Sequence, residues 1–129
     1  MKLPDLAKID DACVLQWSGA VEPLKGAAAQ AHLRYRVVDL GKARDRASLF
    51  AELDRALQLP EHFGKNFDAL ADVLEDRDWL GKGGIAIVML HGNAYREEHP
   101  HEWSTLEDLL GEACEFWKER MTPFWVFVA

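Results

Sequence analysis

The sequence predicts an α/β domain with a small three-stranded parallel sheet and helices packed on it. Residues 85–90 (IAIVML) and 124–129 (FWVFVA) are apolar runs with almost no polar position, which is typical of parallel strands buried on both faces. Strand-like and helix-like segments alternate along the chain, the order expected for parallel strands joined by right-handed crossovers. The length of 129 residues fits one compact domain with its own hydrophobic core.

Residues 1–33 differ from the rest of the chain and are assigned to an N-terminal extension. Within them, 13–19 (CVLQWSG) suit a short strand and 22–33 (EPLKGAAAQAHL) suit an alanine-rich helix. We expect the extension to pack on the same domain, where its strand and helix can extend the sheet. The main part of the domain then spans residues 34–129.

A strand and a helix are predicted next. Residues 34–40 (RYRVVDL) have the aromatic and β-branched content of a buried strand, and Gly41 begins a turn. Ser48 is a suitable cap for a helix over 49–57 (LFAELDRAL), in which leucine recurs every four residues. Pro60 ends this helix, because proline cannot donate the backbone hydrogen bond that a helix interior needs.

The middle of the chain predicts a turn followed by a second helix. Residues 61–66 (EHFGKN) form the turn, with Gly64 able to take a left-handed backbone conformation. Asn66 is a suitable cap for a helix over 67–76 (FDALADVLED). A further break is expected at 81–84 (GKGG), just before the first of the two apolar strands.

The last third of the chain predicts a loop, a long helix and the final strand. Residues 91–102 (HGNAYREEHPHE) are interpreted as a polar loop. Ser104 or Thr105 then begins an amphipathic helix through 106–120 (LEDLLGEACEFWKER), and Pro123 separates it from the last strand.

The charge balance indicates the kind of partner that the protein attracts. Fifteen Lys and Arg against twenty-two Asp and Glu give a formal net charge of −7, with an isoelectric point near 5.2. A surplus of carboxylates repels polyanions and attracts cationic surfaces, so we expect no direct binding to nucleic acid. The same charge is also compatible with a role in solubility alone.

The cysteines and the hydropathy pattern favour a cytoplasmic protein with free thiols. Cys13 and Cys114 are far apart in the sequence and match no metal-ligand spacing. Charges interrupt the N-terminal segment, which therefore lacks the apolar core of a secretory signal. No apolar run approaches the roughly 20 residues of a membrane-spanning helix, so we expect no membrane anchor of that kind. We also expect a monomer.

The predicted helix over 67–76 separates into an apolar face and an acidic face when projected at 100° per residue. The apolar face carries Phe67, Leu70, Val73 and Leu74, and the acidic face carries Asp68, Asp72, Glu75 and Asp76. Carboxylates four residues apart on one helix repel each other. The acidic face is therefore either plain solvated surface or a site where a cationic partner offsets the repulsion.

The histidines raise an enzymatic alternative. His62 near two carboxylates suits acid–base catalysis, and loop histidines with neighbouring glutamates suit a metal site. His99 and His101 lie in a polar loop and lack the helical spacing of metal-binding histidine pairs. We predict no metal and no cofactor. A metal-dependent hydrolase built on Asp68, Asp72 and these histidines remains the alternative.

Residues 59–74 (LPEHFGKNFDALADVL) resemble the signature of the barstar family, Leu-Pro followed by Gly-x-Asn-x-Asp-Ala-Leu-x-Asp. Members of that family are intracellular inhibitors of extracellular guanyl-specific ribonucleases and have a three-stranded parallel sheet. They insert a helix and its preceding loop into the nuclease active site, where carboxylates take the place of RNA phosphates. The resemblance implies a non-catalytic protein whose partner is a basic, secreted-type ribonuclease.

The resemblance also implies partner-binding roles for particular residues. These are Asp72 as the central carboxylate, Asp68 beside it, the loop residues His62, Gly64 and Asn66, Phe67 and Ala71 on the helix, and Glu112 as an outlying acidic contact. His62 and Ala71 stand where the family's prototype has Tyr and Trp, so aromatic anchoring is reduced. A barstar-like binding module with a different protein partner is therefore a second interpretation.

Overall fold

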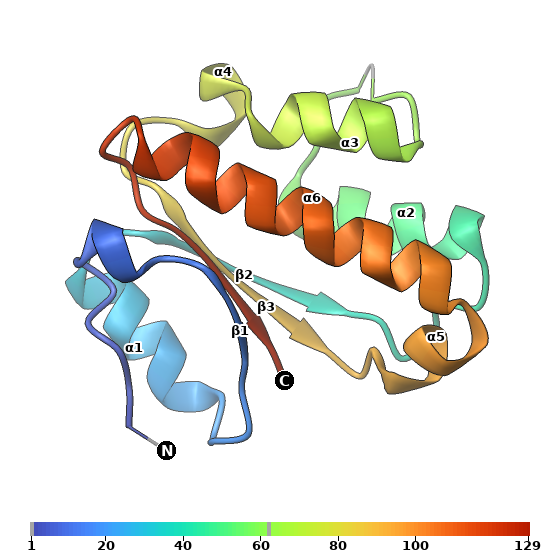
Figure 1. Ribbon diagram of the computed structural model, residues 1–129, viewed down its shortest axis with the longest axis horizontal. Helices are drawn as coiled ribbons and strands as arrows, with labels where there is room; N and C mark the ends of the chain where they lie inside the picture. The colour runs from blue at the N-terminus through green and yellow to red at the C-terminus, as the bar shows by residue number, and fades with distance from the viewer. Residues whose placement is uncertain (1, 62) are drawn as a thin grey trace.

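Within residues 2–61 and 63–129, which the computed structural model describes, the chain forms a four-stranded sheet with helices on both faces (Figure 1). The strands are β1 (Val14–Gln16), β2 (Arg34–Asp39), β3 (Ile85–Leu90) and β4 (Phe124–Val128). Their order is β1-β4-β3-β2, and every neighbouring pair is parallel. The predicted α/β class with a parallel sheet is confirmed, with one strand more than the expected three.

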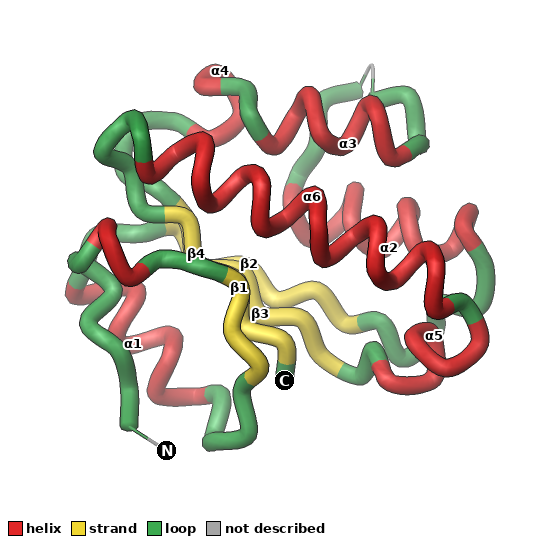
Figure 2. Tube along the Cα trace, in the orientation of Figure 1, coloured by secondary structure: helices red, strands yellow, loops and turns green. Residues whose placement is uncertain are grey.

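The helices are distributed unequally over the two faces of the sheet (Figure 2). A 3-10 turn, η1 (Ile9–Asp11), and α1 (Glu22–Gln30) lie on one side. The other side carries α2 (Arg46–Leu57), α3 (Phe67–Leu74), α4 (Arg77–Leu80), α5 (Asn93–Glu98) and α6 (Pro100–Lys118). In Figure 1, α3 lies above α6 and away from the sheet, so one face of α3 is open to solvent.

The two apolar strands are buried on both faces, as their composition predicted. On β3, Ile87 and Met89 belong to the core beneath α2 and α6, whereas Ala86 and Val88 belong to the core beneath α1. Trp125 and Phe127 of β4 also face α1. Alternation along a strand sends successive side chains to opposite faces, so a strand covered on both sides needs apolar residues at every position.

The N-terminal extension covers the second face of the sheet. Its strand β1 pairs with the outer edge of β4, with Val14 opposite Val126. Leu24 of α1 is fully buried in the same core as Trp125, whose indole Nε1 donates to the Leu6 carbonyl at 3.0 Å. The suggested N-terminal strand and helix are therefore both present, and they account for the fourth strand.

Helix α2 begins earlier than predicted because another residue caps it. The Asp45 carboxylate accepts from the Ser48 backbone N–H at 2.9 Å, and the Asp45 N–H donates to Ser48 Oγ at 3.1 Å. Ser48 is thus the second member of a capping box rather than the cap. The first helical residue is Arg46.

Residues 91–102 were expected to form a loop, but they form α5 and the first turn of α6. Tyr95 and Trp103 are buried, with 1 % and 3 % of their surfaces exposed. Because polar residues surround Tyr95 and Trp103, the two aromatic residues form no recognisable hydrophobic pattern in the sequence. Pro100 starts α6, where its fixed φ suits the first helical turn, so Ser104 and Thr105 lie inside the helix.

The predicted helix over 67–76 is present but ends two residues early, because 74 is its last helical residue. Helix α3 ends at Leu74, and the Asp76 side chain accepts from the Asp78 N–H at 2.8 Å. Asp76 therefore caps the short helix α4, which was not predicted.

None of the helices in residues 2–61 and 63–129 combines the length and apolar character needed to cross a bilayer.

Gly84→Ala is expected to lower the free energy of unfolding by about 3 kcal/mol, measured by urea denaturation. Gly84 has φ +91°, and a Cβ there would lie 2.3 Å from the Pro123 carbonyl oxygen. Gly81 is the matched control, because it has φ +78° and open space around its Cβ position. We expect Gly81→Ala to cost less, about 2 kcal/mol, from its strained backbone conformation alone. Equal losses would rule out the contact with Pro123 as the cause.

Candidate functional site

The loop before α3 is anchored on the core by two apolar residues. Leu59 and Phe63 are each more than nine-tenths buried. The Phe63 ring packs edge-on against Phe50 of α2, with 6.0 Å between ring centroids. Both residues therefore anchor the loop on the core. His62 lies outside the described residues.

Hydrogen bonds of Asn66 hold the start of α3. Its Oδ1 accepts from the Ala69 N–H at 2.7 Å, as predicted for a cap, and its Nδ2 donates to the Gly64 carbonyl at 3.3 Å. The left-handed conformation expected at Gly64 is found instead at Lys65, with φ 53°. The absence of a side chain at Gly64 avoids a close steric contact, since a Cβ there would lie 3.3 Å from the Ala69 Cβ.

The apolar face of α3 packs as the sequence predicted. Leu70, Val73 and Leu74 are buried. The Leu74 carbonyl accepts from Trp117 Nε1 of α6 at 2.7 Å, which ties the end of α3 to its neighbour. Phe67 is half-buried and packs edge-on against Phe50, and Ala71 is half-buried.

The opposite face of α3 presents free carboxylates. Asp68 and Asp72 are exposed, and in the part of the chain that the structure describes neither side chain has a hydrogen bond or an ion pair. Arg46 lies nearby, with its guanidinium 5.5 Å from the Phe67 ring centroid, but its ion-pair partner is Glu102 at 3.3 Å. The two aspartates are thus available to an external cation.

A third carboxylate joins this face from the junction of α3 and α6. Glu75 is half-buried, and its pKa is raised chiefly by burial, then by the negative charges of Glu112 on α6 and of Asp72, while Arg120 partly opposes the shift. Glu112 itself is exposed. The structure therefore brings together Asp72 and Glu112, which the resemblance assigned to one surface, and adds Glu75. Projection of a single helix cannot reveal this group, because Glu112 is 37 residues further along the chain.

Glu75→Gln is expected to raise the free energy of unfolding at pH 7 by about 0.5 kcal/mol, a small gain because solvent screens a half-exposed charge. A raised pKa in the folded state means that ionisation of Glu75 costs stability as the pH rises. The gain should therefore vanish below about pH 4, where the carboxyl is protonated in both states. Urea denaturation of both proteins at pH 4 and pH 7 measures it. An equal difference at the two values would contradict the assigned cause.

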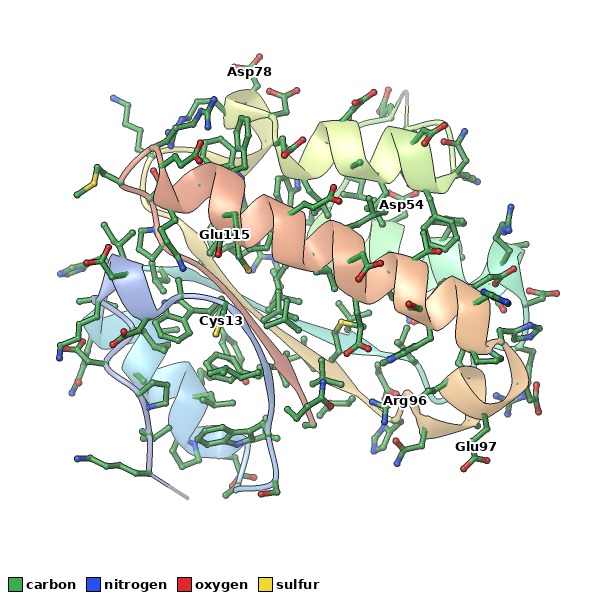
Figure 3. The ribbon with its side chains drawn as sticks, viewed as in Figure 1. Cys13, Asp54, Asp78, Arg96, Glu97 and Glu115 are labelled. Carbon is green, nitrogen blue, oxygen red and sulfur yellow. The ribbon has the colours of Figure 1, made fainter. Side chains whose placement is uncertain are left out.

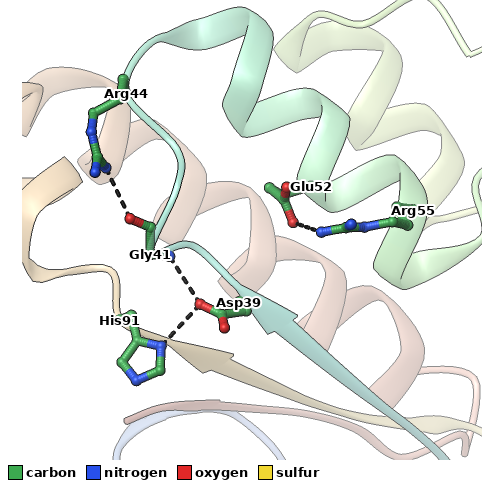
Figure 4. Close-up of polar contacts among 6 residues, drawn as sticks. All are labelled: Asp39, Gly41, Arg44, Glu52, Arg55 and His91. Carbon is green, nitrogen blue, oxygen red and sulfur yellow. Dashed lines mark hydrogen bonds and ion pairs between the residues drawn. The ribbon is translucent and has the colours of Figure 1, made fainter.

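The described histidines of the enzymatic alternative lie on elements other than α3, and His101 is exposed on α6. His99 lies between α5 and α6, with Nε2 2.8 Å from the Arg44 carbonyl oxygen. A further histidine, His91, follows the last residue of β3, and its Nδ1 lies 2.9 Å from Oδ1 of Asp39 at the end of β2 (Figure 4). Within residues 2–61 and 63–129, no three His, Cys, Asp or Glu side chains are grouped as metal ligands.

The fold and this site define an α/β protein in which the acidic helix α3 packs on α6 and presents carboxylates to solvent. A family model described as Barstar (barnase inhibitor) matches residues 33–129. The chain therefore belongs to the barstar family. No match was found among curated proteins. The family match begins at Leu33, so β1 and α1 lie outside it.

Proposed function

We propose that the protein is a stoichiometric inhibitor of a basic, secreted-type ribonuclease of the guanyl-specific, barnase-like class. The observation that carries the proposal is the position of Asp72. It lies in register with the family signature, on the solvent face of a helix whose other face is buried, and has no partner among the described residues. A secreted ribonuclease active site supplies the cations that such a carboxylate lacks.

In this proposal α3 enters the active site of the nuclease, and its carboxylates occupy the places of RNA phosphates. Asp72 receives the central cations, and Asp68 and Glu112 contact charges around them. Preorganisation favours tight binding, because Asn66 and the buried faces of α3 and its loop already fix the helix. The net charge of −7 steers a cationic enzyme toward this face.

The proposal includes no catalysis by the protein itself and places it in the cytoplasm. The matching family model is described as a barnase inhibitor. An inhibitor that blocks an active site needs only to bind it. Cys13 and Cys114 are free thiols, which suit a reducing compartment. Gly64, Asn66 and Phe67 are proposed to contact the enzyme beside the carboxylates, and Ala71 offers a small side chain where an aromatic residue stands in the prototype.

An RNA-cleavage titration tests the proposal. A barnase-type ribonuclease is mixed with increasing amounts of the full chain, and the residual activity is measured. We expect activity to fall linearly to zero at one inhibitor per enzyme, with an association rate that drops as salt is added. Full activity in the presence of excess inhibitor would contradict the proposal. Capture of a different basic protein would then support the barstar-like module with another partner.

A further inference from the structure

Cys13 and Cys114 lie on two segments that pack against each other at one edge of the sheet. Cys13 directly precedes the edge strand β1, and its carbonyl oxygen accepts from the Val126 N–H of β4 at 3.1 Å. Cys114 lies in α6 and has 1 % of its surface exposed. Val126 belongs to the same hydrophobic core as Cys114, and Val14 of β1 packs on that core. The chain on either side of Cys13 is therefore held against the core that contains Cys114.

A hydrogen bond shows how β1 and α6 are aligned. Gln16 Nε2 donates to Glu107 Oε2 at 3.0 Å. Helix α6 runs antiparallel to β1, because it leads from β3 to β4 and all three strands are parallel. Three residues back along β1 from Gln16 cover about 10 Å, and seven residues forward along α6 from Glu107 also cover about 10 Å, in two helical turns. These steps end at Cys13 and Cys114, which therefore lie at the same level.

The charges around the two thiols agree with this placement. Burial raises the pKa of the Cys13 thiol most, Lys118 of α6 opposes the shift, and Asp11 and Glu115 add to it. Burial raises the pKa of the Cys114 thiol to about 12, and the charge of Cys13 adds to that shift. Figure 3 shows Cys13 on the segment that leads into β1 and Glu115 on α6 above it. Each thiol is thus within electrostatic reach of the same α6 charges, and Cys114 is within reach of Cys13.

We propose that Cys13 and Cys114 are an oxidisable thiol pair whose disulfide ties the N-terminal extension to α6. A disulfide needs Cα atoms within about 7 Å. Helix α6 and β1 already have Cα atoms within 8 Å of each other, and β1 is a three-residue edge strand that can make a small adjustment. The bond would close a loop of about 100 residues. The inference does not depend on the proposed function.

Thiol–disulfide exchange with a small-molecule disulfide supplies the oxidation. The thiolate of Cys13, the less buried cysteine, attacks the oxidant, forms a mixed disulfide and releases one thiol. The thiolate of Cys114 then attacks the Cys13 sulfur and releases the second thiol. Two cysteines are oxidised, one small disulfide is reduced to two thiols, and the two cysteine protons pass through solvent to the released thiolates. Because both pKa values are raised, thiolates are scarce at pH 7 and the bond should form faster at pH 8.5.

Oxidation of the folded full chain tests the pair. The protein is incubated with glutathione disulfide at pH 8.5, remaining thiols are alkylated, and the mass is measured. We expect a monomer about 2 Da lighter that takes up no alkylating reagent, with a cross-linked peptide that joins Cys13 to Cys114. Its midpoint of urea denaturation should rise by about 1 M and should return to the original value after reduction with dithiothreitol.

Cys13→Ala and Cys114→Ala are the matched controls, because each keeps one thiol and cannot form the bond. Neither variant should gain stability on oxidation. Cys13→Ala is sufficient if Cys114→Ala, which changes a buried position, does not fold.

Three results would overturn the proposal. The first is a folded parent that stops at a glutathione adduct on Cys13, which would mean that the second thiol is out of reach. The second is a bond that forms only in urea or only between two chains. The third is a cross-linked monomer whose urea midpoint does not rise, since such a bond would not tie the extension to the domain.

Discussion

Asp72→Ala is expected to weaken binding to a barnase-type ribonuclease by about 4 kcal/mol, roughly a thousandfold in Kd. The loss is large because the complex would keep the cations of the enzyme buried without their central counter-ion. The free protein should not be harmed. Alanine is a better helix former than aspartate, and the change removes repulsion with Asp68, so unfolding should cost about 0.5 kcal/mol more.

Inhibition assays and urea denaturation of the same variant separate binding from folding. Glu97→Gln serves as the control, because it removes one charge from an exposed residue far from α3. Inhibition by Asp72→Ala equal to that by the parent would overturn the assignment of α3 as the interface. A large loss of stability would instead mean that Asp72 has a structural role that its exposed position does not indicate.

A chain that begins at Arg34 is expected to lose on the order of 5 kcal/mol or more of folding free energy, which is enough to unfold a typical domain. Without β1 and α1, the face of the sheet that carries Trp125 and Phe127 would be exposed to water. That face would then bind hydrophobic dyes and promote aggregation. Circular dichroism, dye binding and urea denaturation measure the effect.

Two milder changes calibrate this result. Leu24→Ala should cost about 3 kcal/mol, because Leu24 is fully buried against the sheet. A chain that begins at Asp5 should unfold like the full protein, since Leu3 is exposed while Leu6 is buried. If the chain from Arg34 unfolds at the same urea concentration as the full chain, the extension is not part of the folding unit.

Local sequence was sufficient to predict the elements whose own residues show a clear hydrophobic pattern. The runs at 85–90 and 124–129 predicted buried parallel strands because every position along them is apolar. The buried stripe of α3 and the acidic face opposite it followed from helical periodicity alone, as did the cap at Asn66. The resemblance at 59–74 then pointed to Asp72 as the centre of the site.

Errors arose where distant residues decide the local structure. The start of α6 at Pro100 depends on Tyr95 and Trp103 docking on the core, and the polar residues between them conceal this. A second error was local: Asp76 looked like the last residue of a helix, but its side chain accepts from the Asp78 N–H and caps α4.

The strands, the amphipathic helices and the acidic surface could be predicted from the sequence, because they depend on neighbours within a few residues. The pairing of β1 with β4, and the approach of Glu112 on α6 to Glu75 at the end of α3, depend on the tertiary structure. Both contacts depend on long-range packing of apolar side chains. Their hydrophobic pattern in the sequence does not show which of them pack together, because that depends on how their shapes fit. The carboxylates of the candidate site can therefore be found from local sequence, but their positions relative to one another depend on the packing of the core beneath them.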